Sequence, residues 1–401
     1  MKITSDKIKL LEHKAYMLRL GSLRSTTHAG SGHLTSCLSA ADIVSTLFFH
    51  VMKYDIQNFN NPSNDSFILS KGHAAPVLYS AWWQAGVISE QELLTLRRFD
   101  SVLEGHPSVR FDRVAVATGS LGCGLAIGLG QVLAAQYEKK DTYTYVLMGD
   151  GECAEGSVWE AAQLAAYYKA EKLIGIIDCN AFGQSMGTLY GHNSENFVNK
   201  FKSFGWNVIT CNGHNIQELV DAFDSVRHVN GKPTMIIANT FKGYGIADIQ
   251  NKNGWHGKVF THQDLQKIES DIAEMFPDAA LYKDIHHSNN QKIYSDAALP
   301  LPHSNEYVLP EPTYKGSYLT RKSSGQALVE LGKLSKKIIV IDGETKNSTY
   351  TELFEEVFKN QFIEAFIAEQ SMVGIACGYA VEGYIPFIST FASFFARAHD
   401  Q

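Results

Sequence analysis

One stretch, residues 143–185, constrains the fold of this chain more than any other. It begins with a short apolar and aromatic run that ends in a Gly-Asp-Gly turn around Asp150. A segment with apolar residues at helical spacing, 155–169, comes next, and a second apolar run, 173–177, leads straight to Asn180. Strand, helix and strand in this order form a crossover unit, whose two strands are parallel and end at the same edge of the sheet. The sequence therefore predicts a parallel α/β sheet.

Asp150 and Asn180 fall at the carboxyl ends of these two strands, where open α/β sheets bind ligands. The glycines on both sides of Asp150 leave room for a bulky anion to approach the backbone. A carboxylate and an amide are hard oxygen ligands, which suit Mg²⁺ or Ca²⁺ held against a diphosphate. For either residue alone, a solvated turn at a strand end is the simpler interpretation. The pair on adjacent strands favours a metal site.

The composition is that of a globular protein, with 45% apolar and 19% charged residues and a net charge of −7. This charge offers no basic surface for nucleic acid, so no such partner is expected. The six cysteines are scattered without a Cys-x-x-Cys pair, which argues against thiolate metal sites and predicts reduced thiols. The N-terminus is charged and no run approaches the ~20 apolar residues of a membrane span. A cytoplasmic location without membrane contact is expected.

Strand and helix patterns alternate repeatedly over residues 66–245, which predicts a doubly wound parallel sheet in an N-terminal domain, 1–276. Residues 277–316 hold five prolines among polar residues and are predicted to form an interdomain linker. A second α/β unit begins at 317–401. Because the chain ends within a predicted helix, this second domain is expected to be incomplete.

A glycine-rich run at 119–125 does not fit a dinucleotide fingerprint, because its spacing is wrong and no acidic residue follows at the expected distance. It still offers free N–H groups to a phosphate at the start of a helix.

Four histidines lie in glycine-flanked turns, at His33, His73, His106 and His256. A single histidine in a loop is usually a surface residue. Four in such turns favour a site, since a neutral imidazole can both give and take a proton near pH 7. Zinc is a rival interpretation, but no His-x₃-His or Glu-x-x-His spacing supports it.

A series of short motifs extends from the N-terminal region to the C-terminal one. In chain order they are Ser31-Gly-His33, Ser70-Lys-Gly-His-Ala-Ala-Pro76, Gly105-His-Pro107, Ala117-Thr-Gly-Ser-Leu-Gly122, Gly149-Asp-Gly-Glu152, Asp178-x-Asn180, Thr240-Phe-Lys-Gly243, Trp255-His-Gly257, Thr320-Arg-Lys322, Lys346-Asn-Ser-Thr349 and Ile367-Ala-Glu-Gln370. Together they resemble the transketolase family of thiamine-diphosphate enzymes. Gln184 and the Lys346 motif resemble its animal-type branch most.

The resemblance implies a thiamine-diphosphate-binding fold, with a diphosphate-binding domain followed by an incomplete pyrimidine-binding domain. It implies Mg²⁺, for which Ca²⁺ or Mn²⁺ could substitute, on Asp150, Asn180 and the backbone carbonyl of Phe182. The cofactor's diphosphate and thiazolium side is expected along Ser36, His73, Gly119, Ser120, Leu121, Gly151, Asn180, Lys242 and His256.

On the pyrimidine side, the resemblance implies that Glu369 hydrogen-bonds a ring nitrogen and so activates the cofactor, while Phe391 and Phe394 stack on the ring. Taken alone, Glu369 could simply complement a helix dipole, and the two phenylalanines could be core residues. His33, His106 and His256 are expected to move protons on substrate hydroxyls. His33, Arg321 and Ser348 are expected to bind the sugar phosphate, Arg321 through its bidentate fork.

The implied activity is that of transketolase, a transferase of the pentose phosphate pathway. It moves a two-carbon ketol unit reversibly from a ketose phosphate, such as xylulose 5-phosphate, to an aldose phosphate, such as ribose 5-phosphate. Family members are homodimers with active sites at the subunit interface, and their chains continue for about half as much length again. A second hypothesis is therefore a catalytically incomplete protein that binds cofactor or modulates a full-length partner. A third is a relative with another acceptor, such as 1-deoxyxylulose-5-phosphate synthase or dihydroxyacetone synthase.

Overall fold

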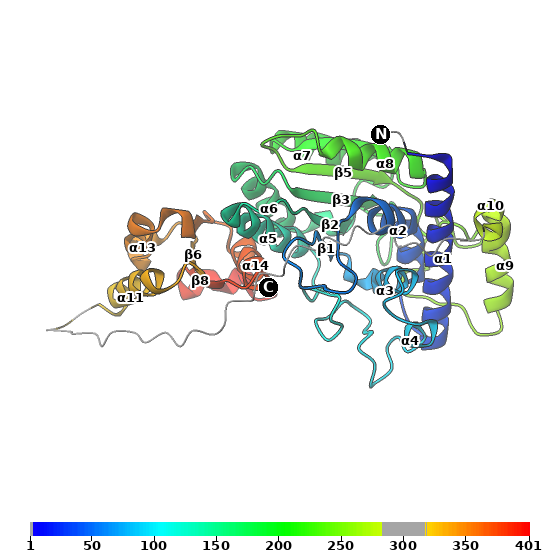
Figure 1. The fold of residues 1–401 in the computed structure, drawn as a ribbon, viewed down its shortest axis with the longest axis horizontal. Helices are drawn as coiled ribbons and strands as arrows, with labels where there is room; N and C mark the ends of the chain where they lie inside the picture. Colours follow the sequence, from blue (N-terminus) through cyan, green and yellow to red (C-terminus); the bar gives the residue numbers. More distant parts are fainter. Residues whose placement is uncertain (1–2, 283–316, 318) are drawn as a thin grey trace.

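Two parallel β-sheets organise the chain in the computed structural model, which describes residues 3–282, 317 and 319–401 (Figure 1). The first sheet has the strand order β1-β2-β3-β5-β4, and the second has the order β7-β6-β8. All pairs within these two sheets are parallel. The predicted α/β class, with a doubly wound sheet followed by a second α/β unit, is confirmed.

The strands of the first sheet are β1 (Ser66–Leu69), β2 (Thr144–Gly149), β3 (Leu173–Cys179), β4 (Asn207–Asn212) and β5 (Thr234–Asn239). In β2, Tyr145 and Leu147 face one hydrophobic core, while Val146 and Met148 face another. Helices cover both faces, so the central strands are nearly continuous apolar runs, and β3 is buried along its whole length.

One face is covered by α1 (Ser5–Ala29), α2 (Leu34–Thr46), α3 (Ala75–Gln84) and α8 (Ile216–Val226). The other is covered by α5 (Gly124–Glu138), α6 (Gly156–Tyr167) and α7 (Glu195–Ser203). Helix α2 runs on into a short π-helical turn. The combined stretch Leu34–Val51 is apolar and long enough to cross a membrane, but 89% of it is buried inside the molecule as a core helix.

Smaller elements lie at the edges. They are α4 (Glu90–Leu93), which begins with a capping box of Ser89 and Glu92, α9 (Leu265–Met275) and α10 (Pro277–Leu281). Helix α10 packs against α1 at the place where the linker is predicted to begin. The remainder of the predicted linker, from 283 to 316, lies outside the described residues.

The second sheet contains β6 (Ile338–Asp342), β7 (Phe362–Glu364) and β8 (Ile385–Ser389). Its helices are α11 (Thr320–Leu334), α12 (Lys346–Thr349), α13 (Glu352–Val357), α14 (Glu369–Val381) and α15 (Ala392–Phe395). The sequence predicts a strand over 362–368, and this is wrong after Glu364. Phe366 has a φ of +55°, a left-handed conformation that ends the extended backbone.

Helices α5 and α14 join the two sheets (Figure 1). Next to this contact, Glu138 at the end of α5 accepts hydrogen bonds from Lys337, just before β6, at 2.7 Å and from the Tyr384 hydroxyl, just before β8, at 2.8 Å. Lys140 completes the cluster at 2.7 Å. Burial acts to raise the pKa of Glu138, but the hydrogen bonds from Lys140, Lys337 and Tyr384 outweigh it and lower the pKa to about 2.

Replacing Glu138 with glutamine is expected to destabilise the joint in a pH-dependent way. A carboxyl whose pKa falls on folding stabilises the protein above its unfolded pKa, near 4.5, and loses that contribution as pH falls towards 2. We expect Glu138→Gln to lower the free energy of unfolding by about 1 kcal/mol at pH 7, since the cluster is partly exposed to water. Urea denaturation should show the variant and the unaltered chain converging as the pH approaches 2. Glu330→Gln, in an exposed pair within α11, is the control and should show no such trend.

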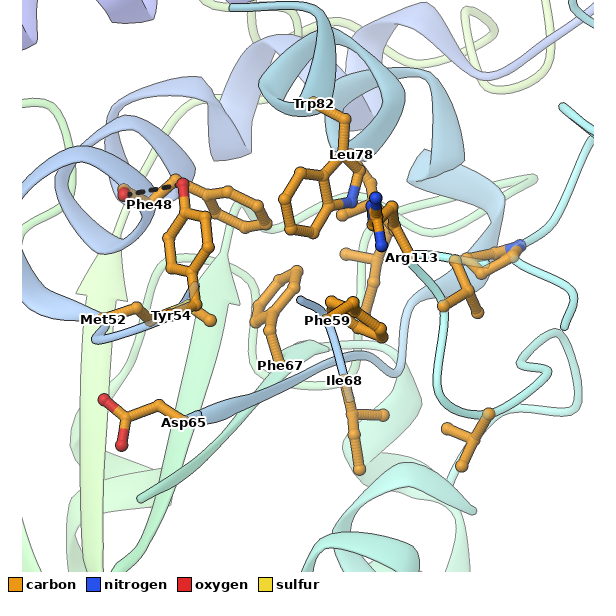
Figure 2. A pocket seen from close by; sticks show the side chains of 14 residues that line it. Phe48, Met52, Tyr54, Phe59, Asp65, Phe67, Ile68, Leu78, Trp82 and Arg113 are labelled. Atoms are coloured by element: carbon orange, nitrogen blue, oxygen red, sulfur yellow. Dashed lines mark hydrogen bonds between the residues drawn. The ribbon is translucent and has the colours of Figure 1, made fainter. Parts of the chain in front are cut away.

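A small cavity lies inside the first core, between the π-helical turn, β1 and α3 (Figure 2). Its walls include Phe59, Phe67 and Trp82, and Arg113 closes one side. The volume is about 20 Å³, enough for little more than one water molecule. A ligand of cofactor size must therefore bind elsewhere.

Candidate active site

Asp150 and Asn180 follow adjacent strands, as predicted, because β2 and β3 pair in parallel up to Gly149 opposite Asp178. The carboxylate of Asp150 accepts hydrogen bonds from the Ala181 amide at 2.7 Å and from the Thr188 hydroxyl at 3.0 Å. Burial, followed by the neighbouring Asp178, raises the pKa of Asp150 to about 6. A buried carboxylate with a raised pKa is one that a cation would stabilise.

The side chain of Asn180 has a fixed orientation. Its Nδ2 donates to Asp178 at 3.0 Å and to Ser39 at 3.4 Å, and its Oδ1 accepts from the Phe182 amide at 3.2 Å. The amide oxygen therefore lies on the same turn as the Phe182 carbonyl. A carboxylate and two neutral oxygens fit Mg²⁺ when the ligand's phosphate oxygens complete the coordination.

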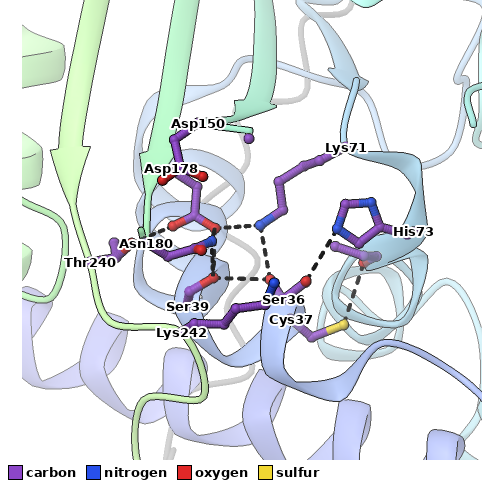
Figure 3. Close-up of polar contacts among 12 residues, drawn as sticks. Ser36, Cys37, Ser39, Lys71, His73, Asp150, Asp178, Asn180, Thr240 and Lys242 are labelled. Carbon is purple, nitrogen blue, oxygen red and sulfur yellow. Dashed lines mark hydrogen bonds and ion pairs between the residues drawn. The ribbon is translucent and has the colours of Figure 1, made fainter. Parts of the chain in front are cut away.

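Asp178 is the centre of a buried polar network (Figure 3). It accepts hydrogen bonds from four side chains, those of Lys71, Ser39 at 2.6 Å, Thr240 at 2.5 Å and Asn180 at 3.0 Å. Burial opposes ionisation, but the Lys71 ammonium and these hydrogen bonds keep the pKa of Asp178 below its usual value. The network fixes the ends of β3 and β5 against α2.

Lys71 extends this network towards two predicted cofactor residues. Its ammonium also donates to the Ser36 carbonyl at 3.0 Å, and the Ser36 hydroxyl lies 3.2 Å from His73 Nε2. Both Lys71 and Asp178 lie within the family motifs, but the motifs predict no role for either side chain. The available signal was a charged residue at the end of a wholly apolar strand, which needs a buried partner.

The four predicted histidines lie together. The ring centroids of His33, His73 and His256 are 4.8–5.2 Å apart, and His106 lies 6.3 Å from His33. Burial, followed by nearby basic side chains, lowers the pKa of each ring, to about 4 for His33 and about 3 for His256. All four are therefore neutral near pH 7. Among the described residues, the buried Nδ1 of His33 has no hydrogen-bond partner, so it is available to a ligand.

The predicted phosphate-binding glycines are held beside this cluster. Glu152, fully buried, accepts from the amides of Gly122 at 2.9 Å and Gly149 at 3.0 Å, and from the Ser70 hydroxyl. These contacts tie the turn to the end of β2 and leave Gly119, Ser120 and Leu121 exposed. Gly122 must be glycine, because its φ is +86° and a Cβ would lie 2.6 Å from Ser157 Oγ.

Lys242 and the residues at the end of β5 complete the site. The Lys242 ammonium lies 2.9 Å from His256 Nδ1 and donates to the carbonyl of Phe182 at 2.7 Å. Burial, followed by the positive charge of Lys71, lowers the pKa of Lys242 to about 8. Predicted residues from three distant segments, near 182, 242 and 256, are thus in contact.

The predicted pyrimidine-side residues form a second group on α14 and α15. Glu369 is buried at the start of α14 and pairs with Arg397 at 2.8 Å, and the Arg397 guanidinium lies 5.6 Å from the Phe394 ring centroid. Phe394 stacks on Phe391 at 5.2 Å. In the described part of the chain, no hydrogen bond, ion pair or ring contact joins this group to the histidine cluster.

The two predicted phosphate-binding residues of the second α/β unit lie on α11 and α12, two helices that contact each other. Arg321 is exposed on α11 and its guanidinium lies 5.7 Å from the Tyr350 ring centroid. Ser348 is in α12, a short helix fixed by the buried Asp342, which accepts from the Thr345 amide at 2.6 Å. Neither residue contacts the histidine cluster within the described residues.

Comparison with protein families identifies the class. The family model "Transketolase, thiamine diphosphate binding domain" matches residues 12–298, and "Transketolase, pyrimidine binding domain" matches residues 317–401. The order of these two domains is the order of the two sheets. The fold is thus that of a thiamine-diphosphate-binding domain followed by a pyrimidine-binding domain.

Individual relatives show to which family within this class the chain belongs. The chain is 44% identical to human transketolase over 400 residues, which is 99% of this chain and 63% of that protein. It is 42% identical to human transketolase-like protein 2, covering 98% of this chain and 62% of that protein. The structure of Campylobacter jejuni transketolase matches with a TM-score of 0.82 at 27% identity, over 98% of this chain and 67% of that one. The chain belongs to the transketolase family, as its motifs predict.

The chain thus spans about 63% of the length of the human protein. Its relatives include transketolases and transketolase-like proteins alike.

Proposed function

We propose that the chain binds thiamine diphosphate and Mg²⁺ at the edge of the first sheet and takes part in two-carbon ketol transfer between sugar phosphates. The observation that carries this proposal is the juxtaposition of one carboxylate and two neutral oxygens with four neutral histidines. Asp150, Asn180 and the Phe182 carbonyl would hold the metal. Gly119, Ser120 and Leu121 would offer exposed N–H groups to the diphosphate.

When bound, the cofactor supplies the nucleophilic carbon that accepts the two-carbon unit. The residues of this chain bind, orient and move protons around it. His33, His106 and His256 are neutral near pH 7, so each can take or give a proton at a sugar hydroxyl. Lys242 lies beside the metal-binding turn, where its charge would meet the diphosphate.

A homodimer would resolve the separation of the two groups of residues. In such a dimer, Glu369, Phe391 and Phe394 of one subunit would meet the histidine cluster of the other, and the active sites would lie at the interface. Arg321 and Ser348 would then bind the sugar phosphate. We also propose a cytoplasmic location for the protein. The second candidate, a protein that binds cofactor without turnover, is favoured by the separation of Glu369 from the histidine cluster, which it does not contact within the described residues.

Titration calorimetry of the 401-residue chain with thiamine diphosphate and Mg²⁺ tests the proposal. We expect Asp150→Asn to weaken binding at least about 10-fold, because it removes the only anionic ligand of the proposed metal set. Asp141→Asn is the matched control, since Asp141 precedes the opposite end of the same strand and is exposed.

The outcomes of this experiment distinguish the two candidate functions, an active enzyme and a protein that binds cofactor without turnover. Binding together with consumption of xylulose 5-phosphate in the presence of ribose 5-phosphate supports the enzyme, and sedimentation of the active species reports whether it is a dimer. Binding without turnover supports the second candidate. If the unaltered chain gives no heat with cofactor and metal, both are wrong.

A further inference from the structure

We propose that His214 is a positioning residue for the candidate diphosphate site, acting with Asp42 and Arg19 to fix the turn that carries Lys242. None of these three residues has a role in the proposed chemistry, yet all are buried. The part of the inference that concerns cofactor affinity rests on the proposed function, whereas the part that concerns the turn does not.

The three side chains come from separate elements and form one polar contact chain. Arg19, on α1, pairs through both terminal nitrogens with the two carboxylate oxygens of Asp42 on α2, one contact being 3.1 Å. His214, after β4, lies with its Nδ1 2.8 Å from Asp42 Oδ2. Burial disfavours the charge on Asp42, but Arg19 and His214 outweigh it and keep its pKa below the usual value. A bidentate pair of this kind holds its partners rigidly.

The far side of the imidazole determines which nitrogen carries the proton. The backbone N–H of Phe241 donates to His214 Nε2 at 2.9 Å. A backbone amide can only donate, so Nε2 must be the bare nitrogen and Nδ1 must carry the proton that is donated to Asp42. The amide and the carboxylate together thus fix the tautomer and the ring orientation, as a carboxylate partner does for many metal-bound histidines.

The aromatic neighbours hold the same turn from the side. The His214 ring stacks on Tyr244, with centroids 3.5 Å apart and an interplanar angle of 15°. The Arg19 guanidinium lies 5.2 Å from the centroid of Tyr244, which is a favourable cation–π distance. The turn is therefore anchored at Phe241 and Tyr244, on either side of Lys242.

Lys242 depends on this anchoring for its place in the site. Its ammonium contacts both the Phe182 carbonyl and His256, which belong to separate segments. Other anchors of the turn include the Gly243 amide, which donates to the Thr35 carbonyl at 3.0 Å, the Lys242 carbonyl, which accepts from the Asn251 amide at 2.7 Å, and Thr240. Removing the Phe241 anchor should leave the turn attached but less well ordered.

Two variants of His214 test the inference. Glutamine can offer one N–H to Asp42 and one oxygen to Phe241, whereas phenylalanine keeps the stacking but removes both hydrogen bonds. In the cofactor-free chain, we expect His214→Phe to speed hydrogen exchange at the Phe241 amide, and His214→Gln to restore much of the protection. Unchanged exchange in His214→Phe overturns the positioning role.

Calorimetry then compares thiamine diphosphate with thiamine, each with Mg²⁺. We expect His214→Phe to weaken binding of thiamine diphosphate about 10-fold and to leave thiamine unaffected. An equal loss for both ligands overturns the link to the diphosphate. If the unaltered chain binds neither ligand, the proposed function fails while the exchange result still decides the role of His214.

The unaltered chain provides a test that does not depend on a variant folding. The ¹⁵N chemical shifts of His214 distinguish its two neutral tautomers. A proton on Nδ1 supports the inference, and a proton on Nε2 overturns it.

Discussion

Replacing Asp178 with alanine is expected to lower the free energy of unfolding by about 3–5 kcal/mol, because the Lys71 ammonium would be left buried without a counter-charge. Lys71 and Asp178 are 1% and 0% exposed, so water cannot compensate the loss. The same change removes the acceptor for Ser39, Thr240 and Asn180, three further buried polar groups. Urea denaturation of the 401-residue chain near neutral pH measures the effect.

Two controls distinguish the cost of leaving a charge buried without a partner from the cost of losing an ion pair in general. Asp141→Ala breaks the pair with Lys172, in which the carboxylate is 83% exposed, and should cost less than about 1 kcal/mol. The double variant Lys71→Met with Asp178→Leu removes both charges and should recover only the part of the loss that is due to the buried charge. It still leaves Ser39, Thr240 and Asn180 without their acceptor. Equal midpoints for Asp178→Ala and Asp141→Ala would show that Lys71 is not isolated by burial.

Local patterns in the sequence predict the parts of the fold that depend on neighbouring residues. The alternation of strands and helices that is predicted over residues 66–245 is observed, for example in the helix Ile216–Val226 and the strand Thr234–Asn239 that follows it. The strand-end positions of Asp150 and Asn180 follow from one crossover unit, because its geometry is set within about 40 residues.

Contacts between distant segments could not be predicted in this way. The pair of Lys71 and Asp178 joins residues 107 positions apart, and His214 meets Asp42 across 172. A buried charge requires a partner, but the sequence does not show which residue that partner is. Helix α7 was missed for a related reason: Glu195–Ser203 is rich in polar residues, and only Phe197, Val198 and Phe201 are buried once the sheet is in place.

The four histidines show which features of a site a sequence motif can predict and which it cannot. Their glycine-flanked turns predict a shared cleft, and the structure places the rings of His33, His73 and His256 about 5 Å apart. The resemblance to the transketolase family predicts that Glu369 contacts the same cofactor as these histidines. Within the described residues, however, Glu369 has no contact with the histidine rings. The motif predicts which residues act together but does not say whether they meet within one chain.

The contact between α5 and α14 is so close that a single methyl group should disrupt it. A Cβ on Gly378 would lie 2.1 Å from the Ile127 carbonyl oxygen, and one on Gly130 would lie 2.2 Å from the Ile375 carbonyl oxygen. Each obstacle is a backbone atom of a helix, which cannot rotate away as a side chain can. The two helices would have to move apart along their whole contact.

Replacing Gly378 with alanine is therefore expected to lower the free energy of unfolding by about 1–3 kcal/mol, despite the higher helix propensity of alanine. Gly156→Ala is the control, because a Cβ at this position would meet no atom of the described residues within 4 Å. The change should be neutral or slightly stabilising. Gly130→Ala should cost a similar amount to Gly378→Ala. Since both methyl groups separate the same two helices, the double variant should cost clearly less than the sum of the single variants. Strict additivity in urea denaturation would mean that each helix relaxes locally and that the joint between the sheets is not one rigid contact.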